Sequence, residues 1–335
     1  MRFGPVPLDE APGAVLAHSV LLPGGRLRKG QVLGDAHLDQ LRAAGLTEIT
    51  VARLDPGDVP EDAAALRLAK ALVAGQGLRL QPVGTGRVNI HATGPGVLNI
   101  NAAAIHAANA VDPMITVATL PEWQRLEPQT MAATVKIIAY AVPGPALARA
   151  CAAAAGALAL CPPVLRSALL VETQIGEEPP PDKGARVTAA RLERLGVALS
   201  GHHVVPHRIE DLAQALRQLS GADLVLILTG SATSDPMDVA PEALRQAGGV
   251  VRHVGMPVDP GNLLFVGELD GRPVIGLPGC ARSPALNGAD WVLERIVCGI
   301  PVGPADIAAM GVGGLLTEIP TRPRPRASGD ISQRK

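Results

Sequence analysis

The residues best suited to bind a charged ligand follow a short apolar run, Leu224 to Leu228. After that run the chain changes abruptly to small and hydroxylated residues, from Thr229 to Ser234. Asp238 and Glu242 then accompany a helix-like segment. Backbone N–H groups and hydroxyls beside a helix N-terminus can receive an anion such as phosphate. The stretch therefore predicts a ligand-binding loop.

The elements that must position this loop can be read from the surrounding pattern. Leu224 to Leu228 is a continuous apolar run, which is typical of a strand buried on both faces of a parallel sheet. A helix is expected to follow, with Pro241 near its start and Gly248 at its end. In open α/β sheets, ligands bind beyond the carboxyl ends of the strands. The loop lies at such an end.

Alternating strand and helix patterns divide the chain into parts. Residues 164–303 predict an α/β fold, a Rossmann-like three-layer domain with a mostly parallel sheet and a hairpin at Asp270-Gly271. Residues 1–145 predict an N-terminal mixed α+β region, and the alanine-rich residues 146–163 a connecting helix. Residues 304–335 are expected to be a largely irregular C-terminal extension.

Composition excludes several classes of partner. The chain has 335 residues, 47% hydrophobic and 18% charged, and its formal net charge of -1 argues against binding to phosphate backbones. Aromatic residues make up 1%, so no platform for stacking bases is expected. We expect no nucleic-acid partner.

Cysteine usage and hydropathy predict a cytoplasmic protein. The four cysteines lie far apart in the sequence and form no C-x-x-C pair, which fits reduced thiols better than a disulfide framework or a zinc site. Met1 to Glu10 lacks the apolar segment of a secretory peptide, and the longest apolar run, Ala150 to Leu165, is too short to span a membrane. We therefore expect no membrane association.

Several motifs in order resemble one family, the molybdopterin-binding domain shared by molybdopterin adenylyltransferase, molybdopterin molybdotransferase and gephyrin. The motifs are Thr229-Gly230, the D-V-x-P-E-A segment from Asp238 to Ala243, Met256 to Gly261, and Leu277-Pro278-Gly279. The D-V-x-P-E-A segment looks like the adenylyltransferase version, and the L-P-G loop looks like the molybdotransferase version.

The N-terminal region adds to the resemblance. Leu8 to Val20, Lys29-Gly30 and Leu41 to Val51 are similar to the opening region of molybdotransferases. The chain as a whole most resembles the stand-alone molybdopterin-binding proteins, which in some relatives precede a nucleotidyltransferase domain.

The resemblance implies a ligand, molybdopterin or adenylated molybdopterin, with Mg²⁺ and molybdate as further reactants. Asp238 is then the expected catalytic and metal-binding residue. The expected cofactor-binding residues are Thr229, Gly230, Ser231, Thr233, Asp235, Asp238, Glu242, Pro260, Gly261, Pro278, Gly279, Cys280, Arg282 and Ser283. Expected partners are a molybdopterin nucleotidyltransferase or a molybdoenzyme, and relatives imply a homo-oligomer.

Departures from the family pattern leave the function open. Ser231 stands where the family loop has a second glycine, which predicts a looser approach to phosphate because glycine alone freely takes positive φ. His207 stands where the adenylyltransferase has an acid, and Cys280 to Ser283 replace the Asn-Pro that continues the L-P-G loop. The chain is accordingly either a transferase that inserts molybdate into adenylated molybdopterin or a non-catalytic cofactor carrier. A nucleotide-binding regulator is the third alternative.

Single residues also have structural interpretations. Asp235 before a proline is an ordinary turn residue, and Cys280 can be a small residue packed beneath a loop. Arg282 can clamp a phosphate or be solvated. His202 and His203 are neighbours on a predicted strand, so their side chains point to opposite faces and are not expected to share a metal ion.

Overall fold

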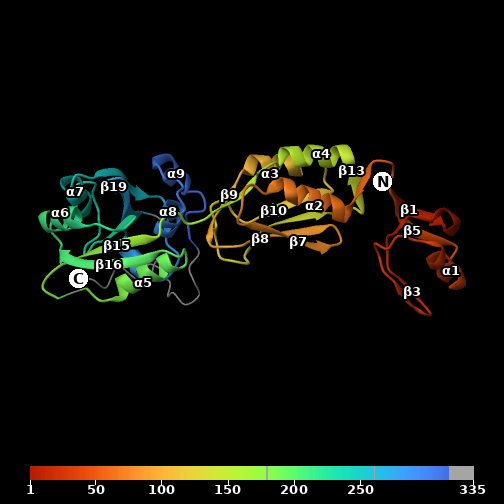
Figure 1. The fold of residues 1–335 in the computed structure, drawn as a ribbon, viewed down its shortest axis with the longest axis horizontal. Helices are drawn as coiled ribbons and strands as arrows, with labels where there is room; N and C mark the ends of the chain where they lie inside the picture. The colour runs from red at the N-terminus through yellow and green to blue at the C-terminus, as the bar shows by residue number, and fades with distance from the viewer. Residues whose placement is uncertain (179, 260, 317–335) are drawn as a thin grey trace, which may run out of the picture. The chain divides into compact units, whose positions relative to one another are not determined.

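A computed structural model describes residues 1–178, 180–259 and 261–316 (Figure 1). The chain divides into two compact units, Met1–Cys161 and Pro162–Lys335. No helix in the described ranges is long and apolar enough to cross a membrane.

The first unit begins with a small sheet and a hairpin, and Leu16 and Val51 of the sheet belong to the same buried cluster as Leu27 of the hairpin. The sheet has the order β1-β5-β2, and β3 pairs with β4. The elements are β1 (Arg2–Pro7), η1 (Leu8–Glu10), β2 (Val15–Leu16), β3 (Val20–Leu22), β4 (Gly25–Leu27), α1 (Asp35–Ala43) and β5 (Glu48–Arg53).

The rest of the first unit packs helices against antiparallel sheets ordered β10-β12-β8-β7 and β11-β9-β14, with β13 paired to β6. The elements are β6 (Asp58–Pro60), α2 (Glu61–Leu72), β7 (Leu78–Gly84), β8 (Arg87–Ala92), β9 (Gly96–Ile100), α3 (Ala102–Asn109), β10 (Ile115–Thr119), β11 (Arg125–Leu126), β12 (Met131–Ile137), β13 (Ala141–Pro143), α4 (Gly144–Ala153) and β14 (Leu158–Cys161). Both helix and strand are present, as the α+β pattern predicts.

The connecting helix expected over residues 146–163 is wrong in its second half. Helix α4 ends at Ala153, and Gly156 then takes a φ of +67° that turns the chain. Leu158 and Leu160 alternate with less buried neighbours, and β14 pairs antiparallel with β9. The alanine-rich composition hid this period-2 pattern, and the strand completes the core of the first unit.

The second unit is built on a six-stranded sheet ordered β16-β15-β17-β20-β19-β18. Its first four strands in that order are parallel; β19 runs antiparallel to β20, and β18 pairs antiparallel with β19 and so has the direction of the first four. The strands are β15 (Ser167–Gln174), β16 (Ala198–Pro206), β17 (Leu224–Leu228), β18 (Val250–Met256), β19 (Asn262–Leu269) and β20 (Arg272–Leu277). Strand β17 has the predicted limits, and each of its residues is fully buried.

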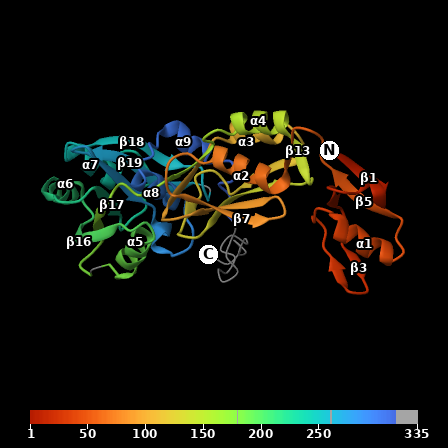
Figure 2. The same cartoon turned by 45° about the vertical axis from the view of Figure 1, so that its right-hand side comes forward.

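Helices cover both faces of this sheet, which confirms the predicted three-layer α/β fold (Figures 1 and 2). Helices α6 (Ile209–Gln218) and α7 (Val239–Gln246) pack against Leu169, Val171 and Ile227. On the other face lies α5 (Lys183–Glu193), joined to α8 (Gly288–Val297) by the Arg191–Asp290 ion pair.

The predicted hairpin at Asp270-Gly271 is confirmed, with both residues at positive φ between β19 and β20. The expectation for residues 304–335 needs a correction at its start. Pro304–Ala309 form helix α9, which has a proline in its first turn and is capped by Asp306. Residues 317–335 of that extension lie outside the described residues.

Strand β20 approaches β19 so closely that Gly276 cannot carry a side chain. A Cβ at Gly276 would lie 1.9 Å from Cε1 of Phe265, a fully buried ring. We expect Gly276→Ala to lower the free energy of unfolding of the second unit by at least about 2 kcal/mol, because overpacking a dense core costs that much. Urea unfolding followed by circular dichroism measures it. Gly279→Ala is the control, since a Cβ there has open space, and equal stability of the two variants would contradict the packing.

Asp223 ties β15 to β17 at the amino ends of both strands. Its Oδ2 accepts hydrogen bonds from the backbone N–H groups of Arg166 (2.7 Å) and Ser167 (3.0 Å). These bonds hold the pKa of the Asp223 carboxyl below its usual value.

Because its pKa is lowered in the folded state, the Asp223 carboxyl stabilises the fold only while it is ionised, so this contribution is lost in acid. The contribution of Asp223 is complete above about pH 4 and is lost as the pH falls through the lowered pKa. We expect Asp223→Asn to lower the thermal unfolding midpoint at pH 7, and the difference from the unmodified chain to narrow below about pH 4. Asp270→Asn, on an exposed turn, is the control. A difference that stays constant down to pH 2 would contradict this role.

Candidate functional site

The carboxyl ends of β15, β17 and β20 meet at one edge of the sheet. The N–H of Gly230, just past β17, donates to Oγ1 of Thr173 on β15 at 2.8 Å. A Cβ on Gly230 would lie 2.7 Å from the carbonyl oxygen of Thr173, so this approach requires glycine. Nδ1 of His207, which follows β16, lies 2.8 Å from the same Thr173 hydroxyl.

Arg282 joins the loop after β20 to β15 and to the residue that follows β17. It lies in the short helix η2 (Gly279–Arg282), and its Nη2 donates to the carbonyl oxygen of Thr229 and to Oε1 of Glu172, each at 3.1 Å. The side chain is 29% exposed. The structure therefore brings Arg282 and Thr229, two of the predicted site residues, into contact.

Glu172 is the residue of this edge that the sequence prediction missed. It lies on β15 and is completely buried, and its second oxygen, Oε2, lies 3.2 Å from Nε2 of His202. Its signal was present in the sequence, because Glu172 interrupts the apolar run that begins at Ala168. An acid inside a buried strand needs partners and is a candidate functional residue.

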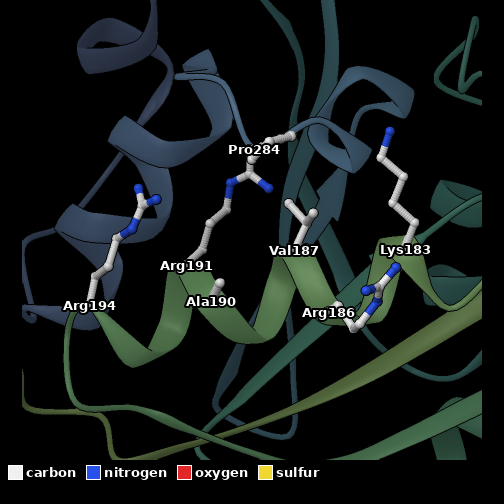
Figure 3. Close-up of a pocket in the computed structure, with 7 residues that line it drawn as sticks. All are labelled: Lys183, Arg186, Val187, Ala190, Arg191, Arg194 and Pro284. Atoms are coloured by element: carbon white, nitrogen blue, oxygen red, sulfur yellow. The ribbon is translucent and has the colours of Figure 1, made fainter.

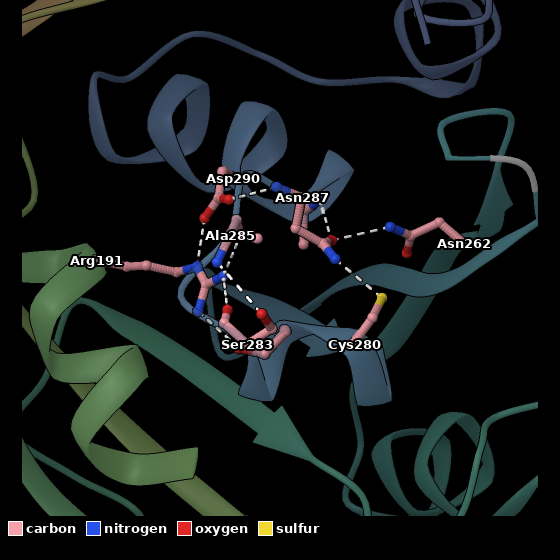
Figure 4. A network of polar contacts seen from close by, with 9 residues as sticks. Arg191, Asn262, Cys280, Ser283, Ala285, Asn287 and Asp290 are labelled. Carbon is pink, nitrogen blue, oxygen red and sulfur yellow. Dashed lines mark hydrogen bonds and ion pairs between the residues drawn. The ribbon is translucent and has the colours of Figure 1, made fainter. Parts of the chain in front are cut away.

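Arg191 of α5 holds η2 and the segment that follows it in place (Figure 4). Its guanidinium is almost fully buried, pairs with Asp290 of α8 at 2.5 Å, and donates to the carbonyl oxygens of Ala281 (2.6 Å), Ser283 (2.7 Å) and Ala285 (3.2 Å). One side chain thus satisfies three backbone carbonyls of an irregular segment. This fixes the predicted site residue Ser283 at the base of the loop.

Asn287 ties Cys280 to the start of β19 (Figure 4). Its Nδ2 donates to Sγ of Cys280 at 2.9 Å, and its Oδ1 accepts from Nδ2 of Asn262 at 2.9 Å. Cys280 is exposed and is a free thiol. Pro278 is buried and Gly279 exposed, while Gly261 precedes Asn262 with a φ of +77°. The predicted site residue Pro260 lies outside the described residues.

Asp238 caps helix α7. Its Oδ1 accepts from the N–H of Val239 at 2.7 Å, and its Oδ2 accepts from the N–H of Ser234 at 2.9 Å. Asp235 closes a turn through Met237 N–H at 2.7 Å, as its alternative interpretation predicts. Each of these carboxylates therefore shapes the loop between β17 and α7.

The remaining residues of this loop differ in exposure. Ser231 is exposed and Thr233 is buried. Ser231 is not among the residues with positive φ, so the serine causes no backbone strain where the family has glycine. The backbone conformation of Ser231 therefore gives no reason for the looser approach to phosphate that this substitution predicted. Glu242, in the first turn of α7, pairs with Arg245 at 3.2 Å.

The described residues contain no group of three or more His, Cys, Asp or Glu side chains placed to hold a metal ion. Mg²⁺ is commonly held by one or two carboxylates together with the phosphates of a substrate. Asp238 could serve as a single carboxylate ligand of this kind, because each of its oxygens accepts one backbone N–H and keeps one further lone pair. Its catalytic and metal-binding roles stay predictions.

A cavity of about 300 Å³ opens beside the loop, between Pro284 and helix α5 (Figure 3). Lys183, Arg186 and Arg194 extend along its helical wall, and Arg191 reaches from the same helix to the loop (Figure 3). Arg186 pairs with Asp182 at 3.4 Å, and both side chains are exposed. The wall of the cavity thus has four cationic side chains, of which Arg186 and Arg191 are paired with carboxylates.

The fold and this edge define a class, an α/β domain that binds ligands in loops beyond the carboxyl ends of parallel strands. Residues 168–296 match the family described as "Probable molybdopterin binding domain", and residues 5–53 match a "Domain of unknown function (DUF8806)". The match to the molybdopterin-binding family lies within the second unit and confirms the resemblance seen in the sequence.

Solved structures similar to the chain have related names. Molybdenum cofactor biosynthesis protein B is 15% identical, with a TM-score of 0.32, and the match covers 41% of this chain and 96% of that one. A molybdopterin biosynthesis protein from Mycobacterium abscessus is 18% identical, with a TM-score of 0.28 and coverages of 40% and 92%. A molybdenum cofactor biosynthesis protein from Pyrococcus furiosus is 12% identical, with a TM-score of 0.21 and coverages of 88% and 61%. A search of curated proteins finds no significant match.

The clamp made by Arg191 leads to a stability prediction. We expect Arg191→Met to lower the free energy of unfolding of the second unit by about 3 to 5 kcal/mol, because it leaves the buried Asp290 carboxylate without its cation. Denaturant unfolding measures the loss. Arg194→Met, at the exposed residue that follows α5, should change stability by less than about 0.5 kcal/mol. Similar losses in both variants would show that the clamp is not specific.

Proposed function

We propose that the second unit binds molybdopterin, or its adenylated form, in the loops that follow β15, β17 and β20. The observation that carries this proposal is Arg282, which joins the three strands at their carboxyl edge inside the domain matched to the molybdopterin-binding family. Molybdopterin has a pterin ring, a dithiolene and a terminal phosphate. A site for it therefore needs a hydrogen-bond donor, preferably a cation, for the phosphate, together with hydrogen-bonding groups for the pterin ring.

The predicted residues divide into two sides of the proposed site. The first side is the segment between β17 and α7, where Gly230 lies among the hydroxylated residues Thr229, Ser231 and Thr233. Gly279, Cys280 and Ser283 follow β20 on the other side and are held by Asn287 and Arg191. In this proposal the phosphate lies between the two sides, beside Arg282 and the residues after β17, and the second side also faces the pterin and dithiolene.

In the catalytic form of the proposal, the domain promotes transfer of molybdate to the dithiolene of adenylated molybdopterin, with departure of AMP. Asp238, oriented by the N–H groups of Ser234 and Val239, would supply one carboxylate to Mg²⁺ beside the substrate phosphates. The bound ion would neutralise charge on the leaving phosphate. The loops would contribute orientation, which is a large part of catalysis when two reactants are brought together.

The second candidate function is a carrier that delivers the cofactor to a molybdoenzyme or to a molybdopterin nucleotidyltransferase. Two observations favour it. His207 occupies the position of the family acid and contacts the Thr173 hydroxyl, so this position supplies no carboxylate. Both oxygens of Asp238 already accept backbone N–H groups. A carrier needs the same pterin contacts without the metal.

Purification of the full chain from a host that makes molybdopterin tests binding directly. We expect the fluorescence of oxidised pterin to copurify with the chain. Asp238→Ala should reduce the retained pterin about tenfold and cost about 1 kcal/mol of stability through loss of the helix cap. Ser231→Ala should reduce retention less, and Asp270→Ala, on a distant exposed turn, is the control.

The same material separates the two candidate functions. Release of AMP on addition of molybdate and Mg²⁺ to chain loaded with adenylated molybdopterin indicates the transferase. Retention of the pterin without release of AMP indicates the carrier. Absence of pterin from the unmodified chain would overturn the proposed function.

A further inference from the structure

Glu172 is a buried acid at the binding edge whose partners are all identified. It is fully buried, its Oε1 accepts from Arg282 Nη2, and its Oε2 lies beside His202 Nε2. The start of α5 lies directly over it, since a Cβ on Gly184 would be 3.0 Å from Oε1. A buried carboxylate is costly unless it is paired, so this arrangement must hold the carboxylate in one orientation.

The pairing leaves part of Arg282 available. Within the described ranges both hydrogen bonds of Arg282 run from Nη2, one to Glu172 and one to the Thr229 carbonyl oxygen. A guanidinium has five N–H groups, so Nε and Nη1 keep three donors. The side chain is partly exposed, whereas Glu172 beneath it is not. The guanidinium is therefore held on one side and open on the other.

We propose that Arg282 is the contact for the phosphate of the ligand and that Glu172 is the positioning residue that holds it there. The inference rests on the proposed function and adds to it the residue that contacts the ligand phosphate and the residue that positions this contact. Glu172 fixes Nη2 through one oxygen, and His202 fixes the other oxygen. A preorganised cation loses less side-chain freedom when it binds an anion than a free arginine would.

Charge and position predict opposite effects when Glu172 is changed. By charge alone, Glu172→Gln removes a negative group near the anion and should strengthen phosphate binding. By positioning, it releases Arg282 and should weaken binding. The direction of the change therefore separates a positioning residue from a residue that only pairs a charge.

The test is a titration of the purified full chain with inorganic phosphate, followed by the ¹⁵N signals of arginine Nε–H groups. We expect Arg282→Met to weaken phosphate binding about tenfold or more, since charge-assisted hydrogen bonds are lost. Glu172→Gln should weaken binding about threefold to tenfold, and Glu172→Asp should restore part of the affinity. Arg217→Met, an exposed arginine near the end of α6, should stay within about twofold of the unmodified chain.

A double variant guards against misfolding. Arg282→Met leaves Glu172 without its cation, whereas Glu172→Gln/Arg282→Met removes both charges and should fold. In a cycle, Glu172→Gln should have no further effect once Arg282 is absent. Unchanged or tighter phosphate binding in Glu172→Gln would overturn the positioning role, and unchanged binding in both Arg282 variants would overturn the contact.

The outcomes also separate this inference from the proposed function. Pterin that copurifies equally with the unmodified chain and the double variant leaves the proposed function standing and overturns the inference. Phosphate binding that depends on Arg282 in a chain that retains no pterin overturns the proposed ligand and leaves the phosphate contact standing.

Discussion

The buried guanidinium of Arg191 is the constraint on which the binding edge depends. It lies between α5 and α8, where a charge is tolerated only if its donors are satisfied, and it bonds to Asp290 and to three carbonyl oxygens, one within η2 and two after it. Those carbonyls belong to an irregular segment and have no ladder to join. The guanidinium of Arg191 and the backbone carbonyls of this segment therefore satisfy each other's hydrogen-bonding groups, and these bonds fix the position of η2.

The two arginine–carboxylate pairs of this domain differ in how they meet solvent. Arg191 and Asp290 are both buried, so their contact fixes the loop and has little freedom left for a ligand. Glu172 is equally buried, but its partner Arg282 is 29% exposed. The first pair holds the backbone that carries the second. A rigid base below a partly open cation is the arrangement that precise ligand contacts require.

Local sequence patterns predicted most of the strands, helices and turns of the second unit, but they did not predict contacts between residues far apart in the sequence. Leu224–Leu228 and the turn at Asp270-Gly271 were predictable because burial and positive φ leave a mark within a few residues. Strand β14 was missed because an alanine-rich sequence does not distinguish the helical period of 3.6 residues from the strand period of two. The contact between Glu172 and Arg282 spans 110 positions. It depends on the strand order β15-β17-β20, which no local pattern specifies.

The departures from the family pattern do not have equal weight. Ser231 adopts a backbone conformation open to any residue, so the loss of a glycine there does not deform the loop. The glycine that the packing requires is Gly230, beside Thr173, and it is present. His207 is different, because it joins the Thr173 hydroxyl and removes a carboxylate from the edge. The choice between transferase and carrier therefore depends on His207 and Asp238 rather than on the shape of the loop.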